Sequence, residues 1–147
     1  MTTNTLKQHE NSNFAIKEIK LVKANFYQKN NLINDNEISI GLSIGSFYSI
    51  RKDIKNAIQL NLSADIELFQ EDENKDNIPI ATVETIVVGI FEYKNDISEK
   101  LLPNLASILY SYIRPIVAQF SVMAKLPPID LPILNLSKIE VKHIEEN

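Results

Sequence analysis

Alternation of apolar and polar residues dominates the chain before residue 94. Between Ile38 and Gly45, Ile and Leu alternate with Ser and Gly, and the same period of two returns from Ile58 to Leu68. This period is typical of a strand with one buried face. A turn around Arg51 to Asn56 separates the two segments, so they are predicted to form a hairpin. Its second strand should turn these side chains inward: Ile58, Leu60, Leu62, Ala64, Ile66 and Leu68.

Two more strands are predicted on either side of this hairpin. The segment from Phe14 to Phe26 favours a first strand, and a change of parity around Lys17 and Glu18 indicates a β-bulge or a bend. The Asn-rich stretch from Tyr27 to Asn36 predicts a crossover loop. After an acid-rich turn, Ile80 to Tyr93 predicts a fourth strand whose centre is apolar on both parities. This strand should be covered on both faces or carry a ligand on one.

A different pattern begins at Leu101. A mostly apolar run without acidic residues continues to Met123, which predicts a long helix with Pro103 in its first turn. Pro115 removes one backbone hydrogen bond, so we expect it to kink the helix or to mark its effective start. The following segment from Leu126 to Leu136 contains three prolines and is predicted to be an apolar loop. The tail after it has Ile139, Val141 and Ile144 among charged residues and could form a short helix or a strand, since its periodicity does not decide between them; we expect a short helix.

These elements predict an α+β fold: a four-stranded antiparallel sheet with a long helix packed on one face and a short C-terminal helix. The chain has 147 residues, which suits one domain. We expect this domain to span residues 14–147. Residues 1–13 are polar, lack the apolar core of a signal peptide and are expected to form a disordered arm. A helix this apolar needs more cover than one sheet supplies, so an oligomer is expected.

The amino-acid composition excludes several classes of function. The chain has no Cys, which excludes disulfides and thiolate metal sites and fits a cytoplasmic location. Its net charge of −4 argues against a nucleic-acid partner. Arg114 lies within the apolar run beside Pro115, which makes membrane insertion costly. Buried against a sheet instead, Arg114 would need a carboxylate or a carbonyl partner.

No catalytic constellation is visible. The two histidines, His9 and His143, lie in opposite terminal segments, and no Gly-rich phosphate loop follows a strand. No carboxylate lies between Leu101 and Leu126. We therefore expect neither an enzyme nor a metal site or cofactor. One alternative is a small-ligand enzyme or binding domain of the hot-dog type, for which Asn104 is the only candidate amide near the helix start.

Several segments match one known pattern. They are Val88-Gly89-Ile90-Phe91 in the fourth strand, Pro103-Asn104, Ile108-Leu109, Tyr112 and Arg114 in the helix, Leu126-Pro127-Pro128-Ile129 and Leu131-Pro132 after it, and the opening Phe14-Ala15-Ile16. With these residues the chain resembles the SecB family of protein-export chaperones over nearly its whole length. The resemblance implies a homotetramer, built as a dimer of dimers with the helices between two sheets.

The resemblance also implies a function. Such proteins are ATP-independent holdases that bind unfolded precursor polypeptides in an apolar groove and keep them export-competent for the Sec translocase and its motor SecA. Ordinary core packing remains the alternative for Phe91, Ile129, Leu131 and Ile133. The implied groove residues are Ile90, Phe91, Leu126, Ile129, Leu131, Ile133 and Leu134, and the implied subunit interface contains Ile108, Tyr112, Arg114, Ile116 and Phe120.

Some positions depart from the family pattern. Glu84 matches an acidic residue that faces SecA in relatives, but Lys23 and Tyr27 stand at two further acidic positions, and the tail is shorter. Docking to SecA should therefore be weaker or absent, unless Asp65 and Glu67 lie on the same surface and compensate. A SecB-like chaperone dedicated to another client, such as an antitoxin, is the alternative function.

Overall fold

The computed structural model describes residues 14–35, 37–94, 97 and 100–145, so the expected N-terminal arm and His9 lie outside the described residues. Five strands form one sheet in the order β1-β4-β3-β2-β5. In chain order the elements are β1 (Phe14–Gln28), β2 (Ser39–Ile50), β3 (Ala57–Glu71), β4 (Asn77–Tyr93), α2 (Leu101–Met123) and β5 (Lys142–His143).

Four of these strands form the predicted antiparallel sheet. β2 and β3 pair as the expected hairpin, from Ser39 opposite Phe69 to Ile50 opposite Ile58. β1 pairs with β4, so the chain between β1 and β2 crosses the end of the sheet, as its Asn-rich sequence predicts. The register of β1 shifts between Ile16 and Glu18, which confirms the predicted bulge. A second shift follows between Leu21 and Lys23.

The prediction of a short C-terminal helix is wrong. The C-terminal tail, residues 137–145 of the described chain, contains instead the two-residue strand β5, which pairs in parallel with β2. The sheet is therefore mixed and five-stranded. A helix of so few residues is marginal in water, whereas the edge of β2 offers backbone partners. Ile139 and Val141 also pack partly against the core.

α2 is continuous from Leu101 to Met123, so the helix neither begins at Pro115 nor is divided there. Pro115 has no N–H to donate to the Ser111 carbonyl, and both residues are exposed, so water can replace the missing hydrogen bond. Pro103 lies in the first turn, as predicted. No helix within the described part of the chain is long and apolar enough to cross a membrane.

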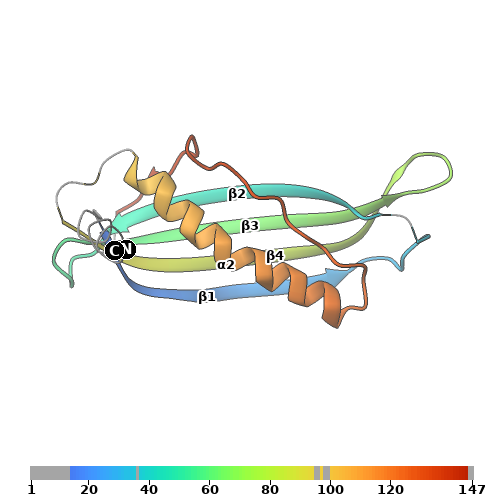
Figure 1. Ribbon diagram of the computed structural model, residues 1–147, viewed down its shortest axis with the longest axis horizontal. Helices are drawn as coiled ribbons and strands as arrows, with labels where there is room; N and C mark the ends of the chain where they lie inside the picture. Colours follow the sequence, from blue (N-terminus) through green and yellow to red (C-terminus); the bar gives the residue numbers. More distant parts are fainter. Residues whose placement is uncertain (1–13, 36, 95–96, 98–99, 146–147) are drawn as a thin grey trace, which may run out of the picture.

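One face of the sheet is covered and the other is open. α2 crosses the covered face diagonally, and the apolar loop (Leu126–Leu136) returns beside it (Figure 1). All six predicted inward residues of β3 are fully buried in the core beneath them. The helix approaches the sheet closely at Gly89, because a Cβ there would lie 2.9 Å from Leu109 Cδ2 and 2.5 Å from Phe91 Cε2. The helix can therefore settle this deeply only over a glycine.

Candidate functional site

Side-chain hydrogen bonds fasten the apolar loop to one flank of α2. The Tyr110 hydroxyl donates to the Pro132 carbonyl (2.7 Å), and Arg114 Nε donates to the Leu131 carbonyl (3.0 Å). Arg114 Nη2 also reaches Asp130 Oδ1 at 3.4 Å. Arg114 thus has a carbonyl partner and a carboxylate partner, either of which would meet the need of a guanidinium group in an apolar run. The loop is held in place beside the helix.

Tyr110 is a buried part of this attachment, with a relative exposure of 4%. Its burial raises the pKa of the phenol, and the nearby Arg114 charge opposes that effect. The hydroxyl therefore stays protonated and keeps donating to Pro132 throughout the neutral range.

The structure separates the residues suggested for a client groove. Phe91, Leu126, Ile129 and Leu131 are buried, with exposures of 0%, 8%, 4% and 1%, and belong to the core. Ile90 lies on the open face, because it adjoins Phe91 on a strand whose side chains alternate. Only Ile133, at 85% exposure, projects fully into solvent, while Leu134 is partly buried. These seven residues do not line one continuous groove within this chain, and their role in client binding stays a prediction.

The residues suggested for the subunit interface lie on both flanks of α2. Ile108, Tyr112, Ile116 and Phe120 recur every four residues and so share one flank. Phe120 stacks on Phe26 of β1, with ring centroids 5.8 Å apart, and Tyr112 is 48% exposed. Arg114 lies on the other flank, against the apolar loop.

Two apolar residues that the structure exposes were not selected by the sequence analysis. Val122 and Met123, in the last turn of α2, are 72% and 70% exposed. The helical period carries the signal: Val122 falls on the same outward stripe as Asn104, Pro115 and Ala118, all of which are exposed. A large apolar residue on the outward side of a helix is the feature that sequence reasoning should have selected.

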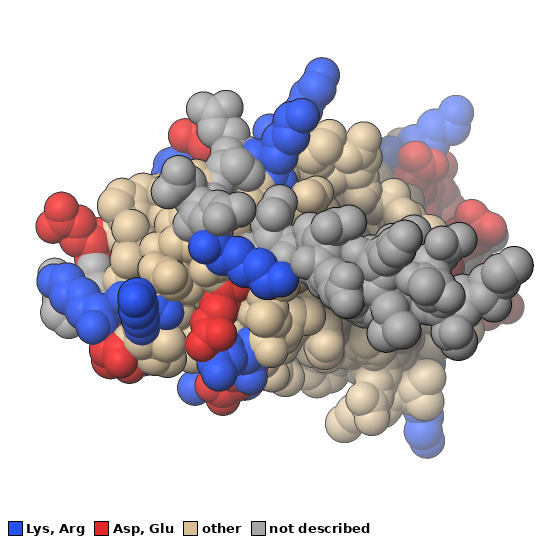
Figure 2. Space-filling model, turned by 60° about the vertical axis from the view of Figure 1, so that its left-hand side comes forward, with Lys and Arg blue, Asp and Glu red and all other residues tan. Residues whose placement is uncertain are grey.

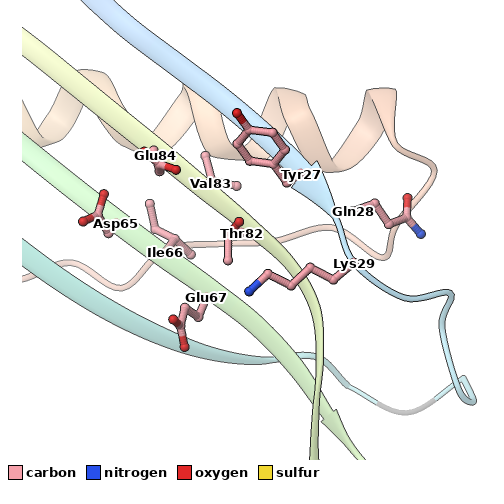
Figure 3. A pocket seen from close by; sticks show the side chains of 9 residues that line it. All are labelled: Tyr27, Gln28, Lys29, Asp65, Ile66, Glu67, Thr82, Val83 and Glu84. Carbon is pink, nitrogen blue, oxygen red and sulfur yellow. The ribbon is translucent and has the colours of Figure 1, made fainter.

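The open face contains the acidic residues that the sequence could not place relative to one another. Asp65 pairs across the strands with Glu84, and Glu67 pairs with Thr82, so all three carboxylates point to this face. They line a hollow of about 640 Å³ together with Tyr27 and Lys29 (Figure 3). In the close-up, Lys29 extends from the end of β1 towards Thr82 and Glu67.

One of these carboxylates is already paired. Lys23 Nζ lies 2.9 Å from Glu84 Oε2, and this hydrogen bond, followed by the charge of Glu84, raises the pKa of Lys23. Both side chains are about two-fifths exposed (41% and 40%), so salt screens the pair. Besides this pair, the hollow contains the carboxylates of Asp65 and Glu67 and the ammonium group of Lys29.

Figure 2 shows one side of the molecule, on which acidic and basic side chains lie interspersed. Among the described residues, no cluster of three or more His, Cys, Asp or Glu could hold a metal ion. Asn104 is exposed on the outward side of α2. It therefore lines no enclosed site within this chain.

Comparison with solved structures identifies the fold. The chain is similar to the Mycobacterium tuberculosis SecB-like chaperone Rv1957, in complex with a ChAD peptide from the Rv1956 HigA1 antitoxin, with a TM-score of 0.65 and 19% identity over 83% of this chain and 91% of that chain. This likeness shows that the chain has a SecB-like fold.

A second solved structure is a protein of unknown function from Streptococcus agalactiae, with a TM-score of 0.44 and 9% identity over 81% of this chain and 96% of that chain. So distant a likeness carries no argument. No protein-family model matches the sequence, and no curated protein matches it.

Proposed function

We propose that this protein is a SecB-like chaperone that binds incompletely folded polypeptide without ATP and serves a dedicated client. Two findings support the proposal: the SecB-like fold, and the antitoxin peptide with which the M. tuberculosis neighbour is complexed. The chemistry required is contact between apolar side chains. Neither a cofactor nor a catalytic residue takes part in it.

The observation that carries the proposal is the exposure of Ile133, Met123 and Val122, at 85%, 70% and 72%. Ile133 follows Pro132, whose carbonyl is fixed by Tyr110, so its backbone is held while its side chain meets solvent. Fixed apolar side chains on a surface suit sequence-tolerant binding, and a flexible Met adapts to different partners.

The test is a double variant, Met123→Ser with Ile133→Ser. We expect weaker suppression of the aggregation of an unfolded test protein, with unchanged circular dichroism and unfolding midpoint, because both side chains are exposed. Gln119→Ser, also exposed on α2, is the matched control and should keep full activity. Full suppression by the double variant would mean that clients bind elsewhere.

A different pair, Ile129→Ser with Leu131→Ser, is what the sequence alone suggests for this test. Both side chains are buried, so the pair should destabilise the fold by several kcal/mol, on the order of 2–5 for each truncation. Lost chaperone activity in that variant would report unfolding and would not locate the client.

The breadth of the client set distinguishes dedication from general export. Capture from the native cell followed by mass spectrometry should recover one dominant small protein if the chaperone is dedicated. A broad set of precursors with signal peptides would instead support service to the Sec translocase.

We further propose that the protein is a homotetramer assembled through the flank of α2 that contains Ile108, Tyr112, Ile116 and Phe120. Tyr112→Asp is the sharpest test, because Tyr112 is 48% exposed while Phe120 already packs on Phe26 within the chain. A buried unpaired carboxylate at the interface should dissociate the assembly. Light scattering that gives a monomer mass for the parent protein would contradict the proposal.

Delivery to SecA is the second candidate function, favoured by the position of Asp65 and Glu67 beside Glu84. Carboxylates grouped on an exposed sheet face attract a basic partner and accelerate its encounter. Lys23 opposes this attraction by pairing with Glu84. We therefore propose that any SecA docking is weak.

A further inference from the structure

Sulfur occurs at only two positions of this chain. The sequence contains no Cys and two methionines, Met1 and Met123, and Met1 lies outside the described residues. Cys thiols and Met thioethers are the sulfur groups of proteins that accept oxygen from peroxides. Within the described part of the chain, oxidation at sulfur can therefore occur only at Met123.

The side chain of Met123 is open to solvent. It lies in the last turn of α2 with a relative exposure of 70%, beside Val122 at 72%. The susceptibility of a sulfur group to oxidation increases with its exposure. A small oxidant can therefore reach this thioether in the folded protein, without local unfolding.

Backbone hydrogen bonds fix the end of α2 that presents Met123. The Leu126 N–H donates to the Ser121 carbonyl (2.9 Å), as in a Schellman C-cap. The Lys125 N–H donates to the Val122 carbonyl (3.1 Å), and Lys125 has the left-handed φ of 58° that this cap requires. None of these bonds involves the Met123 side chain. A chemical change at its sulfur should therefore leave the end of the helix folded.

Oxidation would replace an apolar group with a polar one. The thioether sulfur donates a lone pair to one oxygen of hydrogen peroxide, the O–O bond breaks, and the products are the sulfoxide and water. Sulfur loses two electrons, and the peroxide gains them. Two thiols of a reductase reverse the change: they form a disulfide, and the sulfoxide oxygen leaves as water. The modification is therefore reversible.

We propose that Met123 is a reversible modification site, at which oxidation to the sulfoxide weakens client binding and thiol-dependent reduction restores it. This inference rests on the proposed function, in which Met123 is one of the exposed apolar side chains that contact clients. A sulfoxide packed against apolar client side chains loses its hydrating water without gaining a hydrogen-bond donor. Because the contact at Ile133 is not oxidised, binding is weakened and not abolished.

The affinity for a client before and after oxidation tests the inference. The probe is a fluorescent, permanently unfolded polypeptide without Met or Cys, added after catalase has removed the peroxide. Mass spectrometry of the peptide that contains Met123 verifies the gain of one oxygen atom. We expect the dissociation constant to rise at least about fivefold. Methionine sulfoxide reductase with a dithiol should return it to the starting value.

Two variants separate the effect of Met123 from that of other groups. Met123→Leu keeps an apolar side chain but has no sulfur at this position, so peroxide should leave the affinity of this variant, whatever its value, unchanged. Met123→Gln has a polar side chain of similar length and should bind about as weakly without oxidant as the oxidised parent does. Full affinity of the completely oxidised parent would overturn the inference. An equal loss of affinity in peroxide-treated Met123→Leu would overturn it too.

Protection of the sulfur by the client is an independent measurement. A saturating concentration of the unfolded polypeptide should slow the oxidation of Met123, because a bound apolar segment covers the thioether, whereas a stably folded protein should not slow it. Equal rates with and without client would contradict the inference. Light scattering should give the same mass before and after oxidation. A lower mass after oxidation would overturn the inference, since dissociation would then explain the weaker binding.

Failure of this inference differs from failure of the proposed function. The unoxidised parent tests the proposed function, and its failure to bind any unfolded polypeptide would remove the chaperone proposal together with the effect inferred for Met123. Client binding that persists unchanged after complete oxidation would overturn only the modification site and leave the chaperone proposal standing.

Discussion

The two faces of the sheet use neighbouring residues of the same strands for different purposes. On the covered face, Phe91 and Val87 of β4 are almost fully buried beneath α2, and the buried polar Thr85 donates to the Ala64 carbonyl (3.0 Å). On the open face, Glu84 and Asp65 are paired neighbours that meet solvent. Stability therefore depends on one face, while charge available to a partner is presented on the other. Four predictions test how far this division holds.

The largest contrast is expected between two consecutive residues. Phe91→Ala should lower the free energy of unfolding by about 3–5 kcal/mol, because it leaves a cavity beneath α2. Ile90→Ala, on the open face, should cost about 1 kcal/mol. Denaturant unfolding measures both. Similar costs would mean that the open face is covered in solution, for example by another subunit.

The same substitution at two glycines gives the next contrast. In Gly89→Ala the new methyl would lie 2.5 Å from Phe91 Cε2 and 2.9 Å from Leu109 Cδ2, so overpacking should cost about 1–3 kcal/mol. In Gly41→Ala the nearest atom is Phe69 Cε1 at 3.5 Å, an ordinary contact. That variant should stay within about 0.5 kcal/mol of the parent in thermal or denaturant unfolding. A neutral Gly89→Ala would show that α2 approaches the sheet less closely in solution.

Tyr110→Phe removes a single hydrogen bond from the covered face, to Pro132, and should cost about 1 kcal/mol at neutral pH. Burial raises the pKa of Tyr110, so its contribution is fully present below the ordinary tyrosine pKa of about 10 and is lost as pH rises through the higher folded value. Stability measured against pH should thus fall less steeply in the variant above that range. If the curves of stability against pH run parallel for the parent and the variant, the loss of stability at alkaline pH comes from groups other than Tyr110.

The smallest effect on folding is expected on the open face. Lys23→Asp with Tyr27→Glu breaks the pair with Glu84, but the pKa of Lys23 is raised only by exposed, screened contacts, so unfolding should hardly change. Calorimetry with the cognate SecA should instead detect tighter binding, since two acidic groups join Asp65 and Glu67. Tight binding by the parent with no gain in the variant would remove the reason to expect weak docking.

Local patterns predicted most of the elements because their causes are local. The alternation in β3 and the parity slip at Lys17 were visible in a few residues, and both are confirmed. The same rule of alternation, applied strictly, would have placed Ile90 and Phe91 on opposite faces of the sheet, since neighbours on a strand point to opposite faces. The prediction for the C-terminal tail was wrong for another reason. The helix and strand tendencies of the tail are both weak, and pairing with the edge of β2 decided its conformation.

The sequence by itself determined the four long strands, the helix with Pro103 in its first turn, and the need of Arg114 for a polar partner. Only the tertiary structure decided which apolar side chains of the loop are available to a client. Ile129, Leu131 and Ile133 look alike in the sequence, yet they are 4%, 1% and 85% exposed. Their burial depends on hydrogen bonds to α2 and on contact with distant strands, and burial of this kind is set by long-range geometry.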